Sequence, residues 1–399
     1  MTGQLPIQQQ DRTIIVDVLR GFALFGVLLG NFSSMLSNNV PESIIDAHAT
    51  AFDHLLDQLH TIFIENKFMT LFSILFGYGF GVIMERLEKK NINSTPFFLR
   101  RMFWLFVFGC INLAFWNGDI LHVYAMTGIF LLLFRKRSNR FVLLSSVFFL
   151  FVLPAVIRFY QQYKLSYSVN GDSIVNAYYE AYKFDSLKQV IITNYKTYPF
   201  QWIYTWVEWR DMSETLGRFL LGYYILRLQL LVKLDENISF IKNIWKWTLL
   251  ITIIYIPLQV LADKEMISLP RSVLYPFIKA GILSMAIFYA TSIAQLYSKQ
   301  RAIWLKDIFR NLGRMTLTNY LMETLLYVLV FYNIGLGLLG AFSFGMIWLV
   351  SLVFYFLQGL FSKWWLAKFY YGPVEWVWRQ LTYRKRFPIA KRASVRFQT

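Results

Sequence analysis

Residues 14–36 read IIVDVLRGFALFGVLLGNFSSML, and this stretch decides what kind of protein the chain is. A bilayer core takes about 20 mostly apolar helical residues to cross, and only Asp17 and Arg20 carry charge here. Because these charges interrupt the apolar run and no small-x-small cleavage site follows it, we expect no cleaved signal peptide. The stretch therefore predicts a membrane-spanning helix that stays in the protein.

Further apolar stretches of similar character follow along the whole chain. Together they predict an all-α, polytopic integral membrane protein with about ten transmembrane helices. The predicted spans are residues 14–36, 62–84, 102–116, 120–134, 141–157, 215–232, 245–262, 272–297, 315–332 and 341–361. Residues 160–213 form an extracytoplasmic insert, which its tyrosines and tryptophans place at the membrane interface. Residues 363–399 form a basic tail in the cytoplasm.

Composition and charge support this class. Hydrophobic residues make up 56% of the chain and charged residues 16%, whereas an average soluble domain carries about 25% charge. The formal net charge of +17 makes a nucleic-acid binder the other class to consider. However, most lysines and arginines fall in alternate loops and in the tail, as they do in cytoplasmic segments of membrane proteins. We therefore expect no nucleic-acid partner. We expect a multi-pass protein of the bacterial inner or plasma membrane, with both termini in the cytoplasm.

Cysteine usage excludes several kinds of site. Cys110 is the only cysteine, so the chain has neither a disulfide framework nor a multi-cysteine metal site. We expect no metal.

Ionisable residues within the predicted spans are candidates for function, because burying one costs at least about 2.5 kcal/mol. Asp17 and Arg20 lie three residues apart on one helix face, so they either neutralise each other or bind a polar substrate. Gly26 and Gly30 form a small-xxx-small pair, which predicts the close approach of another helix. Asn31 either serves the site or bonds a neighbouring helix.

Two further candidates, Lys67 and Asp119, are expected in the outer half of the protein. Lys67 lies several residues inside its span, so its ammonium group either snorkels to water or finds an acid, with Asp119 or Glu323 as the partner. Asp119 lies in a tight hairpin between two short spans, which we expect to be recessed beneath the outer surface beside a cavity. There Asp119 either caps the next helix or lines the site.

His60 is a candidate general base. Asp53, His54, Asp57 and His60 recur at helical spacing between the first two spans. Such a cluster either orients an imidazole for catalysis or forms the solvated face of a helix.

The ninth predicted span carries a second polar group. It follows Arg314, and Thr318 and Asn319 can bond either a substrate or another helix. Glu323 lies so deep that it needs a cation or a proton. Arg314 also belongs to two basic rims, residues 86–101 and 299–314, which follow the positive-inside rule and would suit the phosphates of a coenzyme.

At these residues the chain resembles the YeiB family of bacterial membrane proteins, grouped as domain of unknown function 418. The matching motifs are Asp17-Val-Leu-Arg20-Gly-Phe-Ala23 with Asn31, Lys67-Phe68 with Leu71-Phe72-Ser73 and Phe76-Gly-Tyr-Gly-Phe80, Gly118-Asp119-Ile-Leu121 with Tyr124-Ala125, Gly313-Arg314 with Leu317-Thr318-Asn319-Tyr320, and Gly372-Pro-Val-Glu-Trp376 with Trp378-Arg379.

That family is similar to integral-membrane acyltransferases, which include the lysosomal heparan glucosamine acetyltransferase and sugar O-acyltransferases. The resemblance implies that an acyl donor such as acetyl-CoA enters from the cytoplasm and that the acceptor lies toward the outer face. The chain departs from the pattern at two positions. Asn112 stands where related sequences often have a histidine, and Glu323 replaces the usual glutamine.

The leading hypothesis is a transmembrane acyltransferase-like protein that holds an acyl donor or a small-molecule or lipid-linked substrate in a central polar cavity. Arg20 and Arg314 would meet the donor's anionic groups, Lys67 and Asp119 would line the acceptor side, and a proton-handling group would complete the site.

His60, Glu323 and Asp119 are the candidate catalytic residues. Further residues are expected to line the substrate site, namely Asp17, Asn31, Thr318 and Asn319. The alternative is a transporter of a small anion or metabolite, in which the same buried charges select the cargo. In a third interpretation the protein is a non-catalytic scaffold, and the charges are structural pairs.

Overall fold

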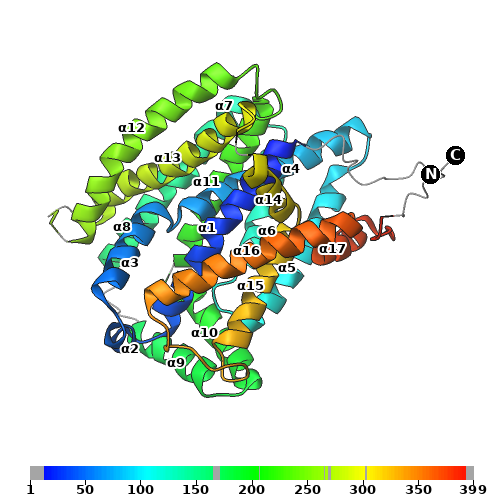
Figure 1. The fold of residues 1–399 in the computed structure, drawn as a ribbon. Helices are drawn as coiled ribbons and strands as arrows, with labels where there is room; N and C mark the ends of the chain where they lie inside the picture. Colours follow the sequence, from blue (N-terminus) through cyan, green and yellow to red (C-terminus); the bar gives the residue numbers. More distant parts are fainter. Residues whose placement is uncertain are drawn as a thin grey trace.

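The computed structural model describes residues 13–164, 171–205, 207–264, 266–267, 271–301 and 303–391. Within these residues the chain is helical, and an isolated antiparallel bridge joins Phe369 to Ala390. The helices are α1 (Ile14–Asn39), α2 (Glu42–Ala47), α3 (Ala51–Phe63), α4 (Lys67–Lys89), α5 (Ser94–Phe115), α6 (Leu121–Phe130), η2 (Leu131–Leu133), α7 (Asn139–Val147), η3 (Phe148–Val152), α8 (Leu153–Lys164), α9 (Gly171–Lys183), α10 (Leu187–Thr205), α11 (Val207–Arg227), α12 (Ile238–Asp263), α13 (Arg271–Ser298), α14 (Ile303–Arg314), α15 (Thr316–Val330), α16 (Phe344–Lys368) and α17 (Pro373–Tyr383) (Figure 1). The last part of the predicted basic tail, residues 392–399, lies outside the described residues.

Seven helical segments in the described part of the chain are long and apolar enough to cross a membrane. They are Ile14–Asn39, Ala51–Lys89, Ser94–Phe115, Asn139–Gln161, Ile238–Asp263, Val273–Ser298 and Phe344–Lys368. The all-helical, polytopic class is thus supported, with fewer clear spans than the sequence predicts. The other predicted spans correspond to the shorter α6 and α15 and to the charged α11.

The hairpin around Asp119 joins helices of unequal length. α5 begins at Ser94 rather than at residue 102, so it has 22 residues and is long enough to cross. The helix extends beyond the predicted span of residues 102–116, because it continues through Arg100 and Arg101, which interrupt the apolar run. α6 has only 10 residues.

The predicted ninth span is the second half of a broken helix. α14 ends at Arg314, Met315 interrupts the helix, and α15 runs for 15 residues from Thr316. The apolar pattern alone hides this break, because α14 is amphipathic rather than apolar. A smaller break separates α3 from α4, where Asn66 adopts the left-handed conformation with φ of 63°.

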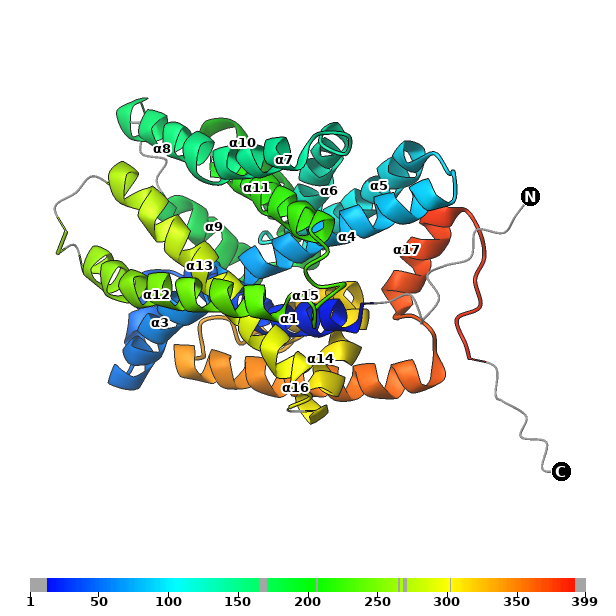
Figure 2. The ribbon, with the colours of Figure 1, turned by 90° about the horizontal axis from the view of Figure 1, so that it is seen from above.

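α1 lies in the middle of the molecule, with α4 on one side and α14 and α16 on the other (Figure 2). Its backbone touches that of α14, because a Cβ at Gly21 would overlap the carbonyl oxygen of Phe309 and one at Gly313 would overlap that of Asp17. Of the predicted small-xxx-small pair, Gly26 allows the close approach of another helix, because a Cβ there would overlap the ring of Phe68 on α4. A Cβ at Gly30 would meet nothing within 4 Å.

α12 and α16 form much of the apolar exterior. In the most apolar stretch of each helix, only 17% of the residues of α12 and 28% of those of α16 are buried, whereas 72% are buried in α1. Large side chains such as Ile254 and Phe356 are exposed on these helices. A surface of this kind suits contact with lipid tails.

The insert between α8 and α11 covers the hairpin that carries Asp119. Tyr182 is fully buried and stacks on Tyr332 with 4.4 Å between ring centroids, so this tyrosine does not face the headgroups as expected. Asn194 and Tyr195 of α10 donate hydrogen bonds to the backbone carbonyls of Ala114 (3.0 Å) and Cys110 (2.7 Å) on α5. The insert thereby closes over the C-terminal end of α5.

Candidate functional site

A cavity of about 270 Å³ runs between α1, α4, α5, α6, α15 and α17. On α1 its lining extends from Thr13 to Asn31, which corresponds to about 27 Å along the helix axis. One end lies at the terminus of α1 that the charge pattern assigns to the cytoplasm. The cavity is therefore long, narrow and nearly parallel to the membrane normal if α1 spans the bilayer.

The mouth of the cavity is strongly basic. Five arginines line it together with two carboxylates. These residues are Arg20, Arg86, Arg101, Arg314, Arg379, Asp17 and Glu375. The excess of positive over negative charge among these residues favours the binding of a ligand with several negative charges.

Close packing holds the arginines in place. Arg20 forms an ion pair with Asp17 (3.5 Å), and the absent side chain at Gly79 leaves room for its guanidinium group. The Arg101 guanidinium stacks on the ring of Trp378 at 3.5 Å, and the Trp378 indole N–H donates to the Arg101 carbonyl (3.0 Å). The mouth is thus assembled from α1, α5 and the C-terminal helix α17.

Glu375 clamps α17 onto the start of α15. Its Oε1 accepts the backbone N–H groups of Leu317 (2.7 Å) and Thr318 (3.0 Å), and its Oε2 accepts the Thr318 hydroxyl (2.6 Å). These N–H groups belong to the first turn of α15, which has no other intrahelical partner for them. Burial nevertheless raises the pKa of Glu375 above its usual value, against the effect of these hydrogen bonds.

The middle of the cavity is apolar. Val27, Phe72, Phe76, Met102 and Leu105 line it. An extended chain of low polarity can occupy this part without losing hydrogen bonds to water.

The inner end is polar again and borders a buried histidine–aspartate pair. Asp119 Oδ2 lies 2.7 Å from His122 Nδ1 and also accepts the His122 backbone N–H (3.1 Å). Asn112 donates to Asp119 Oδ1 (2.8 Å). Tyr320, which lines the cavity, donates its hydroxyl to the same oxygen (3.4 Å) and so connects the pair to the cavity.

This arrangement can act as a base. When Nδ1–H donates to Asp119, the imidazole is held in the tautomer whose Nε2 accepts a proton. Asn112, Asp119 and His122 are each no more than 4% exposed, so the pair is shielded from bulk water.

Comparison with known proteins places the chain in a family. It is 31% identical to the uncharacterized protein YxaH of Bacillus subtilis, over 99% of this chain and 100% of that protein. The chain belongs to the YeiB family. The family described as "Protein of unknown function (DUF418)" matches residues 225–385. The uncharacterized protein YeiB of Escherichia coli is 26% identical over 96% of this chain and all of its own length. No solved structure matches the chain.

The geometry of this YeiB-family protein brings together part of the predicted site. Asp17, Arg20, Asn31 and Arg314 line the cavity. Asp17 and Arg20 do form the ion pair considered above, and they face the cavity as a pair. Asp119 borders the cavity through Tyr320.

Glu323 lies directly behind the cavity wall. Its Oε2 accepts a hydrogen bond from Asn31 Nδ2 (3.0 Å), while its Oε1 has no partner among the described residues. The side chain is fully buried, and within the described part of the chain its donor is a neutral amide. This environment favours a protonated carboxyl group.

Lys67 and His60 lie elsewhere. Lys67 is 1% exposed, so it does not snorkel, and neither Asp119 nor Glu323 is its partner. Its ammonium group donates to the Thr61 carbonyl and lies over the ring of Tyr255. The two acids have other partners, since Asp119 bonds His122 and Glu323 bonds Asn31. His60 packs against the rings of Phe344 and Trp348, away from the cavity lining.

Thr318 and Asn319 connect helices and do not line the cavity. The Thr318 hydroxyl bonds Glu375. The Asn319 amide donates to the hydroxyl of Ser362 on α16 (3.1 Å), and its backbone carbonyl accepts from Gln358 (2.8 Å).

The sequence predictions missed the main candidate base. His122 follows Asp119 by three residues at the start of α6, where Asp119 precedes the helix and accepts the His122 backbone N–H. This spacing was the available signal. Arg86, Arg101 and Arg379 were recognisable only as basic residues in a rim or a motif, because their convergence depends on the fold of the C-terminal helix.

Proposed function

We propose that this protein is a membrane-embedded acyltransferase that uses an acyl-CoA type of donor. One observation carries the proposal, namely a single cavity with a basic mouth and an apolar channel, at whose inner end Tyr320 is hydrogen-bonded to Asp119 of the buried His122–Asp119 pair. A coenzyme A thioester has the matching order of groups, with phosphates at one end, a long arm and a reactive thioester at the other.

The ends of the cavity favour this donor over a membrane lipid. The five arginines at the mouth exceed the two carboxylates, whereas one phosphate of a lipid would balance only part of that excess. The inner end offers Asn31 and Tyr320, which a hydrocarbon tail would leave without hydrogen bonds. A nucleotide with several phosphates at one end and a polar, reactive group at the other end matches both ends of the cavity.

The proposed reaction uses His122 as a general base and then as a general acid. His122 takes the proton of an acceptor hydroxyl or amine, and the acceptor atom forms a bond to the thioester carbonyl carbon. The carbon–sulfur bond then breaks, and the protonated imidazole returns the proton to the leaving thiolate, giving free coenzyme A and the acylated acceptor. Asp119 stabilises the imidazolium that forms between the two steps.

Binding of the donor is the first test. Purified protein in detergent is titrated with acetyl-CoA and with dephospho-CoA, and bound ligand is measured by equilibrium dialysis. We expect saturable binding of acetyl-CoA that weakens roughly tenfold to a hundredfold in Arg86→Leu and Arg379→Leu, since each lost charged contact is worth about 1.5–3 kcal/mol. Lys89→Leu, an exposed neighbour outside the cavity, is the control.

Transfer or slow hydrolysis of labelled acetyl-CoA is the second test. His122→Asn should lower the rate by about 10²–10⁴-fold while acetyl-CoA binding persists. The exposed His54→Asn is the matched control and should retain activity. Absence of saturable binding at millimolar acetyl-CoA would contradict the proposal.

A transporter of a small anion or metabolite is the second candidate, and the broken helix α14–α15 favours it. Interrupted helices at a central cavity are a recurring feature of transporters, and Arg314 at this break lines the cavity. Uptake of labelled substrate into proteoliposomes, with no acyl transfer in the same preparation, would support this candidate instead.

A further inference from the structure

Aromatic rings accompany the arginines at the mouth of the main cavity. Tyr370 and Tyr371, in the turn between α16 and α17, both line it, and their ring centroids are 6.3 Å apart. The Tyr370 carbonyl accepts a hydrogen bond from Arg314 Nη2 (3.3 Å). The Arg379 guanidinium lies over the Tyr371 ring, 4.6 Å from its centroid. Each of the two tyrosines therefore contacts an arginine of the mouth.

The backbone of this turn is held on both sides. The Tyr370 N–H donates to the Ile389 carbonyl (2.9 Å), and the Trp365 indole N–H donates to the Tyr371 carbonyl (2.8 Å). Although its backbone is bonded in this way, Tyr370 keeps 40% of its surface exposed. An aromatic ring that is already held in place can bind a planar group at a small cost in conformational entropy.

Tyrosines near a membrane surface often face lipid headgroups, and this is the other role to consider. Trp364 of α16 fits such a role, because it is exposed, lies outside the cavity lining and has the Lys368 ammonium group over its ring. Tyr370 and Tyr371 differ from Trp364 because both line the cavity. Their position favours contact with a ligand in the mouth.

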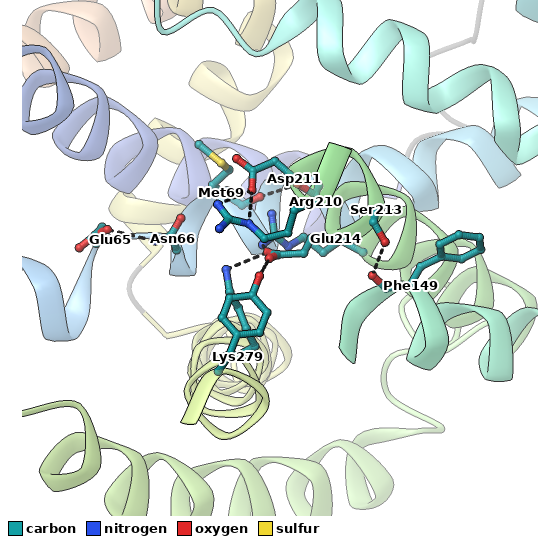
Figure 3. Close-up of polar contacts among 12 residues, drawn as sticks. Glu65, Asn66, Met69, Phe149, Arg210, Asp211, Ser213, Glu214 and Lys279 are labelled. Carbon is teal, nitrogen blue, oxygen red and sulfur yellow. Dashed lines mark hydrogen bonds and ion pairs between the residues drawn. The ribbon is translucent and has the colours of Figure 1, made fainter. Parts of the chain in front are cut away.

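The other large group of charges in the described part of the chain is built differently. Around Glu214 (Figure 3), Lys279 Nζ donates to Glu214 Oε2 (2.9 Å), and Arg210 forms an ion pair with Asp211 (3.1 Å). Cations and carboxylates pair with one another there, as expected of a cluster that joins α11 to α13. At the mouth, guanidinium groups such as that of Arg379 also lie over aromatic rings. Arginines beside aromatic rings are typical of sites that bind phosphates together with planar bases.

We propose that the ring of Tyr370 stacks on the base of a purine nucleotide whose phosphates lie against Arg314 and Arg379. The inference rests on the proposed function, in which this nucleotide is the adenine nucleotide part of coenzyme A. In a nucleotide, one sugar joins the base to a phosphate. At the mouth, one residue likewise joins an exposed ring to the contact with Arg314. The ring offers a stacking surface for the base, and the guanidinium groups offer hydrogen bonds to the phosphates.

Ligand binding to the full chain in detergent tests the proposal. Equilibrium dialysis measures the dissociation constants of acetyl-CoA, ADP and acetyl-phosphopantetheine, which has the arm and the thioester of the donor but no base. Tyr370→Leu should weaken the binding of acetyl-CoA and of ADP about fivefold to a hundredfold, the usual effect of losing one stacked base. The affinity for acetyl-phosphopantetheine should stay within about twofold.

Matched variants separate the ring from the rest of the residue. Tyr370→Phe keeps the ring and should bind all three compounds like the unmodified protein. Tyr370→Leu keeps the backbone carbonyl that Arg314 contacts. Tyr160→Leu, at an exposed tyrosine outside the cavity lining, is the control. If Tyr370→Leu does not fold, photolabelling of the unmodified protein with azido-ADP gives the answer, since the label should map to the peptide that contains Tyr370.

The results distinguish this inference from the proposed function. If acetyl-CoA binds and Tyr370→Leu leaves its affinity unchanged, or weakens acetyl-phosphopantetheine equally, no base stacks on Tyr370, and the acyltransferase proposal stands. If ADP binding depends on the Tyr370 ring but acetyl-CoA is neither transferred nor hydrolysed, the nucleotide site stands and the acyltransferase proposal fails. If neither ADP nor acetyl-CoA binds at millimolar concentration, both are overturned.

Discussion

Two glycines of α1 differ sharply in their surroundings although both lie in the same apolar helix. Gly21 touches the backbone of α14 at Phe309, whereas Gly30 faces open space. A side chain at Gly21 would force the two helices apart, and one at Gly30 would only add helix propensity.

This contrast gives a paired prediction. Gly21→Ala should destabilise the protein by about 1–3 kcal/mol or more, because the new Cβ overlaps the Phe309 carbonyl. Gly30→Ala should be neutral or stabilise it by up to about 1 kcal/mol. Thermal unfolding of both variants in the same detergent measures the difference. Equal effects of the two substitutions would show that α1 and α14 do not pack as described.

Among the helices, α17 is joined to the start of α15 by one carboxyl group and to α5 by the contacts of Trp378 with Arg101. Glu375 bonds the first turn of α15, and its pKa is raised above the usual 4.5 by burial. A carboxyl group whose folded-state pKa is raised binds its proton more tightly in the folded protein. Its contribution to stability is therefore complete below about pH 4.5 and is lost as the pH rises through the folded-state pKa.

The expected result concerns the difference between two proteins. As the pH rises above 4.5, the Tm of the unmodified protein should fall relative to that of Glu375→Gln, which has no titrating group at this position. Exposed Glu42→Gln is the control and should show no such relative change. A relative rise of the unmodified protein with pH would mean that ionised Glu375 is the stabilising form.

Helix boundaries show how far sequence reasoning reaches. The uninterrupted apolar runs of α1, α12, α13 and α16 predict those helices well, because length and hydropathy alone decide them. The break at Met315 and the early start of α5 escaped prediction, because α14 is amphipathic rather than apolar and because Arg100 and Arg101 interrupt the apolar run of α5.

The candidate site divides in the same way. Asp17, Arg20, Asn31 and Arg314 were predictable, since charged or polar residues in apolar helices face a protein interior. The partners of Lys67 and Thr318 were not. Lys67 bonds the Thr61 carbonyl, and Thr318 bonds Glu375. The spacing of residues along the sequence does not predict either contact.

For the whole molecule, the orientation in the membrane follows from charge and can be measured. Most basic residues lie in the predicted cytoplasmic segments, and the loops at residues 138 and 185 lie on opposite sides in that topology. Reporter fusions at these two positions should give opposite signals, with the fusion at 138 cytoplasmic. The same signal from both would refute the topology.

The stacking of Arg101 on Trp378 also orders events during synthesis. All seven apolar segments precede α17 in the chain, so a ribosome has delivered every one of them before Trp378 and Arg379 emerge. The basic mouth is therefore completed last. A chain that terminates early, just after α16, inserts its spans yet lacks Glu375 and Arg379, and the start of α15 loses its clamp. The arginine side chains of the mouth therefore come together only after α17 has been made.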